Sequence, residues 1–359
     1  MSARTSQALA AMLADFDARR PAALARAVSM VENRRDGADA LLAALHSRVG
    51  RSWRIGITGP PGSGKSTLAM QLAKHYRAAD MTVGVVAVDP TSPFTGGALL
   101  GDRVRMEAVA LDPGVFIRSM ATRGSLGGLA GATRDVCDVL DAYGFDRIII
   151  ETVGVGQSEL DISRTADSSV VVLVPESGDS IQTLKAGLME IADLFVVNKA
   201  DRPGADRLVH ELELMLGLRA GHVQQSTPAH HGVELKAANP ARQARELAAR
   251  SDAESWTPPV LKSVANEGTG AKELAEALDR HRVYLDASGL LRERRRRRLR
   301  ERVRDEAEHR LRRRLWTDAA TEHWLNGEMA ALESGTTSPL AVADALLARS
   351  GSLLTGTER

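Results

Sequence analysis

Residues Gly59 to Ser66 read GPPGSGKS, and this stretch decides the fold expected for the chain. It fits the pattern G-x-x-x-x-G-K-[ST] and lies between an apolar run, WRIGIT (53–58), and a helical pattern that begins near Lys65. Glycines let the backbone turn its N–H groups toward phosphate oxygens, and the N-terminus of the following helix adds its dipole. The sequence therefore predicts a phosphate-binding loop between a strand and a helix.

Individual residues of this loop have predicted roles. Lys65 is expected to reach the β- and γ-phosphates of a nucleotide and to act in catalysis, and the Ser66 hydroxyl is expected to ligate Mg²⁺. The residues predicted to contact the nucleotide here are Gly59, Pro60, Pro61, Gly62, Ser63, Gly64, Lys65, Ser66 and Thr67.

Outward from the loop, short β-branched runs alternate with helical segments. Continuous apolar strands separated by helices predict an α/β fold of the P-loop NTPase type, with a mostly parallel central sheet flanked by helices. Ligands of such folds bind at the carboxyl ends of the strands. The expected domains are an N-terminal helical cap (1–50), the nucleotide-binding domain (51–287) and a C-terminal helical extension (288–359). The strand-like runs are WRIGITG, TVGVVAVD, GVFIRSM, DRIIIETV, SSVVVLVP, DLFVVNK and PPVLKSVA.

The tetrapeptide NKAD (198–201) follows a buried strand pattern and predicts which base is bound. Guanine presents two adjacent donors, N1–H and the exocyclic amine, and the carboxylate of Asp201 can accept both. Adenine presents a lone pair there, and sites of this kind discriminate by about 10⁴-fold. Asn198, Lys199 and Asp201 are therefore predicted to bind the base of GTP or GDP.

Three acids between these motifs are candidates for the catalytic centre. Asp89 follows a strand, Asp102 lies in the loop beyond it, and Glu151 begins ETVG. Mg²⁺ prefers carboxylates and water in octahedral geometry, so these three acids and Ser66 are candidate metal ligands, although each acid taken alone is more often a helix cap or a solvated loop residue. The backbone N–H of Gly154 can contact the γ-phosphate and so couple the shape of this loop to the nucleotide state.

Bulk composition limits the alternatives. The 359 residues are 43% hydrophobic and carry a formal net charge of +1, which gives no argument for nucleic acid or an acidic membrane as partner. The single cysteine, Cys137, excludes an internal disulfide and is expected in the core with Val136 and Leu140. Asp15 and Asp17 interrupt the region where a signal peptide needs apolar residues, and no apolar run approaches about 18 residues. We expect a cytoplasmic protein with no membrane span.

An arginine-rich helix is predicted over residues 291–316, with thirteen arginines between positions 292 and 314. Acids are interspersed, and no aromatic residue precedes Trp316. Three interpretations stand: a dimerisation arm, a solvated helix, or a nucleic-acid contact, which the absence of stacking aromatics disfavours. An apolar stripe along one side of the helix favours the dimerisation arm. The residues of this stripe are Leu299, Val303, Ala307, Leu311 and Leu315.

Five separated motifs, in order, resemble the MeaB/ArgK/MMAA family of P-loop GTPases. They are GPPGSGKST, VAVDPTSPFTGGALLGDR, ETVGVGQSE, LKAGLMEIADLFVVNKAD and the C-terminal tail, and the resemblance covers about residues 1–330. The family consists of chaperones of adenosylcobalamin-dependent acyl-CoA mutases, which implies GTP hydrolysis, such a mutase as partner, and homodimerisation through the C-terminal extension. The resemblance also implies that Asp89, Asp102 and Glu151 surround Mg²⁺ and the attacking water. By the same resemblance, Lys185 lies in an additional switch segment through which the mutase stimulates hydrolysis.

The sequence departs from the family pattern at two places. Val264-Ala265 stands where the family usually shows Ser-Ala, although the Ala265 N–H is still expected to contact the guanine carbonyl oxygen. The polar stretch 221–257 is longer than expected for the family, and a solvated loop is favoured there over a metal site. The histidines that raise the metal interpretation are His222, His230 and His231.

Other functions remain open at this point. A nickel-inserting GTPase would carry Cys or Cys/His metal sites, and one cysteine argues against it. A kinase is suggested by the transport-kinase label attached to similar sequences, and transfer of the γ-phosphate to an acceptor would distinguish it. A non-enzymatic arginine-rich binding module would keep its function after Lys65→Ala.

Overall fold

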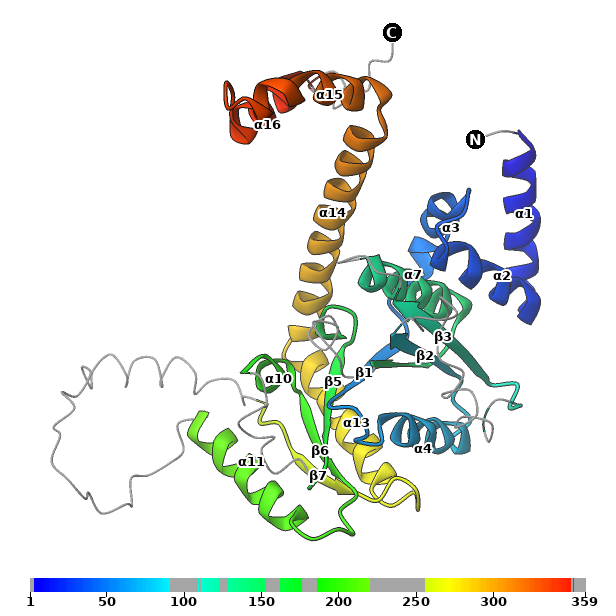
Figure 1. The fold of residues 1–359 in the computed structure, drawn as a ribbon. Coiled ribbons are helices and arrows are strands. Elements are labelled where there is room, and N and C mark those ends of the chain that lie inside the picture. The colour runs from blue at the N-terminus through cyan, green and yellow to red at the C-terminus, as the bar shows by residue number, and fades with distance from the viewer. Residues whose placement is uncertain are drawn as a thin grey trace, which may run out of the picture. The chain divides into compact units, whose positions relative to one another are not determined.

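The computed structural model has a central sheet of seven strands (Figure 1). Their spatial order is β3-β2-β4-β1-β5-β6-β7, and every pairing between them is parallel. The predicted α/β fold is therefore confirmed, and each strand-like run of the sequence forms a strand. The strands are β1 (Trp53–Thr58), β2 (Val83–Pro90), β3 (Val115–Thr122), β4 (Arg147–Thr152), β5 (Ser168–Leu173), β6 (Leu194–Asn198) and β7 (Val260–Ser263).

Strand β1 marks the point where the direction of sheet growth reverses. The chain places β2, β3 and β4 on one side of β1, and β5, β6 and β7 on the other. Ile57 of β1 pairs with Glu151 of β4 and with Val170 of β5, so the strands end at one common edge. Crevices at such switch points are where open α/β sheets bind ligands. The loop after β1 is therefore placed where a ligand is expected.

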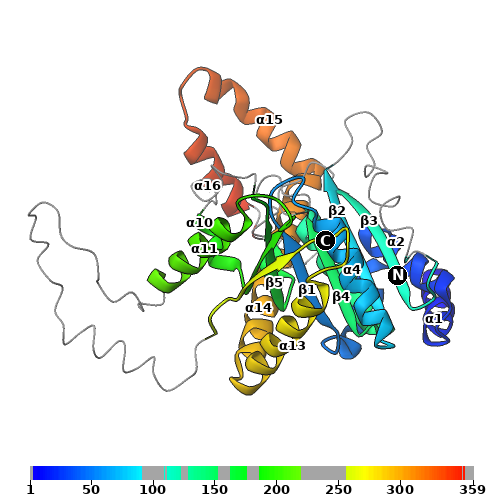
Figure 2. The same cartoon turned by 90° about the horizontal axis from the view of Figure 1, so that it is seen from below.

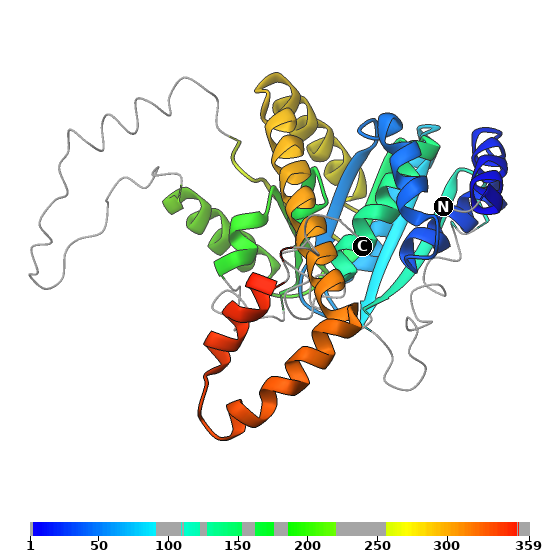
Figure 3. The same cartoon turned by 90° about the horizontal axis from the view of Figure 1, so that it is seen from above.

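Helices cover both faces of the sheet because the strands are apolar on both sides. On one face, α4 and α13 pack on β1, β2, β4, β5 and β6 (Figure 2). The opposite face is covered by the N-terminal helices with α7 at the β2 and β3 side, and by α10 and α11 at the β6 side (Figure 3). These helices are α4 (Lys65–Ala78), α7 (Gly128–Tyr143), α10 (Ala186–Ile191), α11 (Ala205–Arg219) and α13 (Ala271–Ala287).

Three helices precede the sheet, and they are joined to it by apolar contacts. Pro21 occupies the first turn of α2, where its missing N–H costs no hydrogen bond. Leu24, Val28 and Leu41 are buried in the same cluster as α7 and strands β2 to β4. Cys137 on α7 is fully buried in this cluster, as predicted, and burial raises the pKa of its thiol to about 12. The helices are α1 (Ala3–Asp17), α2 (Pro21–Glu32), α3 (Ala38–Leu45) and the short η1 (His46–Arg48).

A buried polar chain fixes α13 at the amino-terminal edge of the sheet. The indole N–H of Trp53 donates to Ser168 Oγ (3.2 Å), which is hydrogen-bonded to His281 Nδ1 (2.8 Å). Ser168 Oγ thus links Trp53 of β1 to His281 of α13. His281 Nε2 lies 3.3 Å from Asp193 Oδ1, and Trp256 donates to the Asp193 carbonyl (2.8 Å). Sequence patterns gave no sign of these contacts.

The C-terminal region is helical, as predicted. Contacts divide the chain into two compact units, Met1–Leu291 and Arg292–Arg359. No residue of the long arginine-rich helix is buried. The last two helices pack on one another through Val342 and Leu346. The helices are α14 (Leu290–Thr317), α15 (Ala319–Glu333) and α16 (Pro339–Arg349).

Among the residues that the structure describes, no helix combines the length and apolar character needed to cross a membrane. The structure describes residues 3–90, 109, 111–122, 128–152, 162–175, 186–219, 256–349 and 351.

Candidate functional site

The GPPGSGK loop follows β1 and leads directly into α4, as the motif predicts. Two of its glycines are required by their surroundings. At Gly59 (φ 139°) a Cβ would lie 2.1 Å from the carbonyl oxygen of Val172, and at Gly64 (φ 88°) it would lie 2.3 Å from Asn198 Nδ2. L-residues also rarely adopt these backbone angles. The loop is therefore packed tightly against the ends of two neighbouring strands, which fixes its curvature.

Lys65 is the first residue of α4 and is 5% exposed. Its Nζ donates hydrogen bonds to the carbonyl oxygens of Gly59 and Pro60, both at 2.9 Å. The ammonium group is thus held against the start of the predicted phosphate-binding loop. A cation fixed there complements the negative charge of a triphosphate.

Ser66 and Glu151 meet at the carboxyl edge of the sheet. Ser66 Oγ donates to Glu151 Oε1 at 2.6 Å, and both residues are buried. Glu151 lies on β4 between β1 and β2, where it pairs with Ala87. Asp89 follows two residues later on β2, which places its backbone near the same edge. Predicted Mg²⁺ ligands from α4 and β4 are therefore brought together, and the backbone of a third lies on the adjacent strand.

Asn198 at the end of β6 connects two loops instead of facing outward. Its Nδ2 donates to the Ser63 carbonyl at 2.8 Å. Its Oδ1 accepts from Ser263 Oγ and from the Ala265 N–H, both at 3.0 Å. One buried amide thus holds the phosphate-binding loop and the loop after β7 at fixed positions. The sequence placed Asn198 at the nucleotide site, but nothing in it indicated this role.

Asp201 and Lys199 lie on the turn that follows β6. Lys199 adopts a left-handed backbone (φ 57°), which is uncommon for a lysine, and the neighbouring Ala200 N–H donates to the Ser263 carbonyl at 3.0 Å. The side chain of Asp201 is exposed. Its carboxylate can accept the two guanine donors without first breaking a buried contact.

The backbone N–H groups of Val264 and Ala265, in the loop predicted to bind guanine, both make internal hydrogen bonds. The Ala265 N–H donates to Asn198, and the Val264 N–H donates to the Thr269 carbonyl at 3.1 Å. A contact between Ala265 and the guanine carbonyl oxygen therefore competes with an internal hydrogen bond. Gln71 lies on α4, the helix that follows the phosphate-binding loop. It donates to the Ala265 carbonyl at 3.0 Å and so holds the loop after β7 in position.

Comparison with known proteins identifies the family. The model of the family described as "Methylmalonyl Co-A mutase-associated GTPase MeaB" matches residues 24–320. The chain belongs to the MeaB family. A protein of Pyrococcus abyssi that is named as a GTPase is 50% identical over 281 residues, which are 78% of each chain. The GTPase ArgK of Escherichia coli is 33% identical over 322 residues, 89% of each chain.

A solved structure agrees with this assignment. A protein described as a LAO/AO transport system kinase is 26% identical, with a TM-score of 0.65 over 96% of this chain and 97% of its own. As a member of the MeaB family, a family of P-loop GTPases, the chain is a GTP hydrolase, as the sequence predicted. The observed loop, the Ser66–Glu151 contact and the NKAD turn lie at one sheet edge, where open α/β sheets bind their ligands.

Several residues that the sequence analysis singled out lie outside the described residues. They are Asp102, Gly154, Lys185, the side chain of Asp89 and the histidines at 222, 230 and 231. Within the described part of the chain no group of three or more His, Cys, Asp or Glu side chains could hold a metal. The predicted Mg²⁺ set thus includes two acids whose side chains are not described, and it stays a prediction.

Three residues of the site were missed in the sequence. Ser263 and Gln71 position the loop after β7, and Thr152 donates to Thr58 Oγ1 at 3.0 Å, joining the ends of β4 and β1. Gln71 and Ser263 belong to none of the five quoted motifs, and Thr152 lies within ETVGVGQSE but was given no role there. Their only signal is position: each lies within a few residues of a strand end or on the P-loop helix.

Proposed function

We propose that this MeaB-family GTPase is a nucleotide switch that serves an adenosylcobalamin-dependent acyl-CoA mutase. In this role it gates the loading of the cofactor and protects or reactivates the mutase. The observation that carries the proposal is the family match over residues 24–320, whose description names methylmalonyl-CoA mutase. The geometry supports a switch, because the strand that carries Glu151 leads directly into the loop predicted to sense the γ-phosphate.

Binding of GTP is assigned to the residues at the carboxyl edge. The phosphate-binding loop and Lys65 would hold the triphosphate, and Asp201 would accept the guanine donors. Asn198 keeps the two nucleotide loops in register through its hydrogen bonds to Ser63 and Ala265. A triphosphate bound in this way would have its γ-phosphate near Glu151, whose carboxylate would orient an attacking water.

The oxygen donors at this edge fit Mg²⁺. A buried hydroxyl and a buried carboxylate lie within 2.6 Å of each other, and hard oxygen donors are what Mg²⁺ prefers. Ser66, Asp89, Asp102 and Glu151 would hold the ion. When bound, it would neutralise negative charge on the phosphate oxygens. The Ser66–Glu151 hydrogen bond holds both of these oxygen ligands beside the phosphate-binding loop.

Lys185→Ala tests the link to the mutase. We expect intrinsic GTP hydrolysis to change less than about twofold, whereas stimulation by the mutase disappears, because the lysine supplies positive charge to the transferring phosphate only when the partner repositions its segment. The measurement is the release of labelled phosphate from γ-labelled GTP, with and without purified candidate mutases. Lys272→Ala, which removes an exposed lysine from α13, is the matched control.

The same assay separates the switch from its alternatives. Equal stimulation of the wild type and Lys185→Ala would contradict the role of Lys185, and no stimulation of the wild type by any acyl-CoA mutase would contradict the partner. The structural relative described as a transport system kinase favours a second candidate, a kinase. Label that appears on an acceptor, instead of as free phosphate, would establish it.

Homodimerisation through the C-terminal extension (288–359) is part of the proposal, beside a cap over residues 1–50 and a GTPase domain over 51–287. In α14 the apolar stripe is exposed: Leu299 is 49%, Val303 71% and Leu311 46% exposed. A second copy of α14 would cover this stripe, and the interspersed acids and arginines would pair across the contact. The proposal places the dimer in the cytoplasm.

Val303→Asp tests this contact. We expect the mass in solution to fall from twice the 38.5 kDa of a single chain to that of the monomer, because a carboxylate would be buried in an apolar seam. Light scattering after size exclusion measures it. Val283→Asp makes the same change at a valine on α13 that is 67% exposed, and should leave the mass unchanged. A dimeric Val303→Asp protein would contradict the assignment of the stripe.

A further inference from the structure

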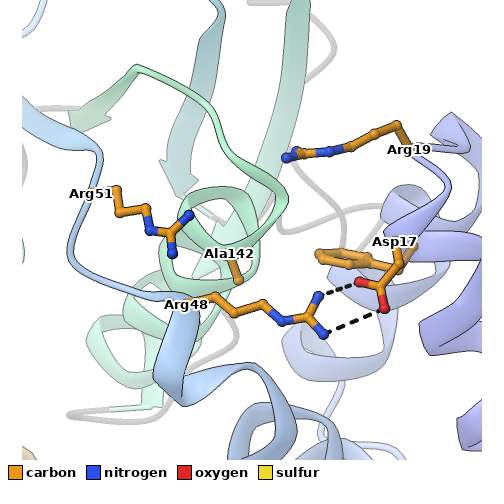
Figure 4. A pocket seen from close by; sticks show the side chains of 6 residues that line it. Asp17, Arg19, Arg48, Arg51 and Ala142 are labelled. Carbon is orange, nitrogen blue, oxygen red and sulfur yellow. Dashed lines mark hydrogen bonds and ion pairs between the residues drawn. The ribbon is translucent and has the colours of Figure 1, made fainter.

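An arginine-lined pocket lies at the amino-terminal edge of the sheet (Figure 4). It has a volume of about 290 Å³. Strand β1 begins at Trp53, two residues after Arg51 in the pocket wall, and ends at Thr58 beside the phosphate-binding loop. The pocket and the nucleotide site therefore lie at opposite edges of the sheet. Its lining residues are Phe16, Asp17, Arg19, Arg48, Arg51 and Ala142.

The pocket is strongly positive. Three arginines against one aspartate give the described lining a formal charge of +2. Asp17 hydrogen-bonds through both carboxylate oxygens to Arg48, and this bond holds the pKa of Asp17 below its usual range. The aspartate therefore stays ionised and orients Arg48, but it cannot balance the other two guanidinium groups. An anion with about two negative charges would neutralise the remaining positive charge of the pocket.

Arg19 has an unfavourable backbone conformation. Arg19 has φ 58° in the turn between α1 and α2, a conformation that L-residues other than Gly, Asn and Asp rarely adopt. Its guanidinium lies 5.0 Å from the centre of the Tyr143 ring, a cation–π contact. A Cβ at Gly144 would lie 2.7 Å from Arg19 Nη1, so the glycine leaves space for this group. Strain of this kind is concentrated at functional positions.

The wall that carries Arg51 is also fixed before any ligand binds. The backbone N–H groups of Gly50, Arg51 and Ser52 donate to the Asp141 carboxylate at 2.8, 3.1 and 3.0 Å. The side chain of Arg51 is exposed. Figure 4 shows Arg19, from the turn after α1, and Arg48 and Arg51, from the segment between α3 and β1, around Ala142. Fixed segments that present guanidinium groups to one space reduce the entropy lost on binding an anion.

We propose that this pocket is a second anion site, which binds a phosphate monoester group. Such a group carries about −1.5 to −2 charge at pH 7, which matches the pocket, and guanidinium forks bind its oxygens in pairs. A carboxylate supplies only one charge. The volume lies at the lower limit for small-molecule sites, so it accepts a phosphate head group and not a whole nucleotide. A phosphorylated metabolite and a phosphorylated side chain share this chemistry.

Chemical protection of arginines tests the site on the full-length protein. The nucleotide site is first saturated with a non-hydrolysable GTP analogue and Mg²⁺, so that phosphate cannot report on the P-loop. Phenylglyoxal modification of each arginine is then followed by mass spectrometry with inorganic phosphate, glycerol phosphate or a phosphoserine peptide. For a dissociation constant near 1 mM, a 10 mM probe should slow modification of Arg19 and Arg51 by about tenfold. Sodium chloride at matched ionic strength should not.

Matched variants distinguish binding of the anion in this pocket from a general screening of charge at the surface. Arg19→Gln should reduce the protection of Arg51 to less than about twofold, because two-point binding of the anion is lost. Arg20→Gln removes the same charge from the adjacent residue, which pairs with Asp15 outside the pocket, and should leave protection unchanged. If Arg19→Gln does not fold, Arg51→Gln with protection read at Arg19 replaces it.

Three results would overturn the proposal. They are no protection at 10 mM of any probe, equal slowing at the exposed Arg207 on α11, or an equal loss of protection in Arg20→Gln and Arg19→Gln. Among supporting results, similar protection by glycerol phosphate and by the peptide identifies a free phosphate ester as sufficient. Protection by the peptide at a tenfold lower concentration identifies a phosphorylated protein as the source.

Discussion

Asp201→Asn is expected to lower the affinity for GTP by about 10³-fold or more and to create affinity for xanthosine triphosphate. The carboxylate accepts from both N1–H and the exocyclic amine of guanine, whereas the amide turns one acceptor into a donor that faces the guanine amine. Xanthine carries a carbonyl oxygen at that position, so the amide and the base are complementary again. Calorimetric titration of both nucleotides with Mg²⁺ measures the change.

The exposure of Asp201 lets this test separate an effect on nucleotide binding from an effect on folding. Because its side chain is exposed before the nucleotide binds, the substitution should not disturb the fold. Asp206→Asn, at the start of α11, removes an equally exposed carboxylate that pairs with Lys262 and should keep full GTP affinity. Unchanged GTP binding by Asp201→Asn would refute the base assignment, since a bidentate contact cannot be lost without effect.

The fold could be predicted because its signals are local. A strand buried on both faces needs a continuous apolar run, and TVGVVAVD, DRIIIETV and SSVVVLVP each have one. The glycines of the phosphate loop likewise satisfy conditions within a few residues of themselves. The order of the strands in the sheet, with its reversal at β1, was not predicted from the sequence.

The tertiary hydrogen bonds of the site could not be predicted, because they join residues far apart in sequence. Asn198 contacts Ser63, 135 residues away, and Gln71 contacts Ala265, 194 residues away. Such pairs follow no period, and either partner alone reads as an ordinary polar residue near a strand end. The motif N-K-x-D located Asn198 correctly, but a motif gives the place of a residue and not its partners.

The arginine pocket also could not be predicted, because its residues come together only in the folded chain. Helices α2 and α3 separate Arg19 from Arg48 and Arg51, and the three lie in no pattern among the many arginines of this chain. Only the packing of α1 to α3 on α7 brings them around Ala142. The arginine run in α14 drew attention in the sequence, whereas these scattered arginines form the compact positive site.

Lys65→Ala is expected to abolish GTP hydrolysis, with a fall in kcat of about 10³-fold, and to weaken GTP binding as well. Removal of one preorganised donor from a developing oxyanion costs about 10²- to 10³-fold, and a buried ammonium contributes at the upper end of that range. Lys65 also bonds to the carbonyl oxygens of Gly59 and Pro60, so its loss frees the start of the loop and adds to the effect on binding. Single-turnover hydrolysis of labelled GTP separates the two contributions.

Lys74→Ala provides the control, because Lys74 is exposed on the same helix α4 and its loss should change neither parameter. Lys65 donates to the carbonyl oxygens of Gly59 and Pro60, and thermal unfolding checks that the variant remains folded. A folded Lys65→Ala protein that keeps a tenth of wild-type hydrolysis would exclude the lysine from phosphoryl transfer. A folded but inactive variant that still supported the mutase would instead separate the chaperone role from the nucleotide, because a switch without its γ-phosphate contact has only one state.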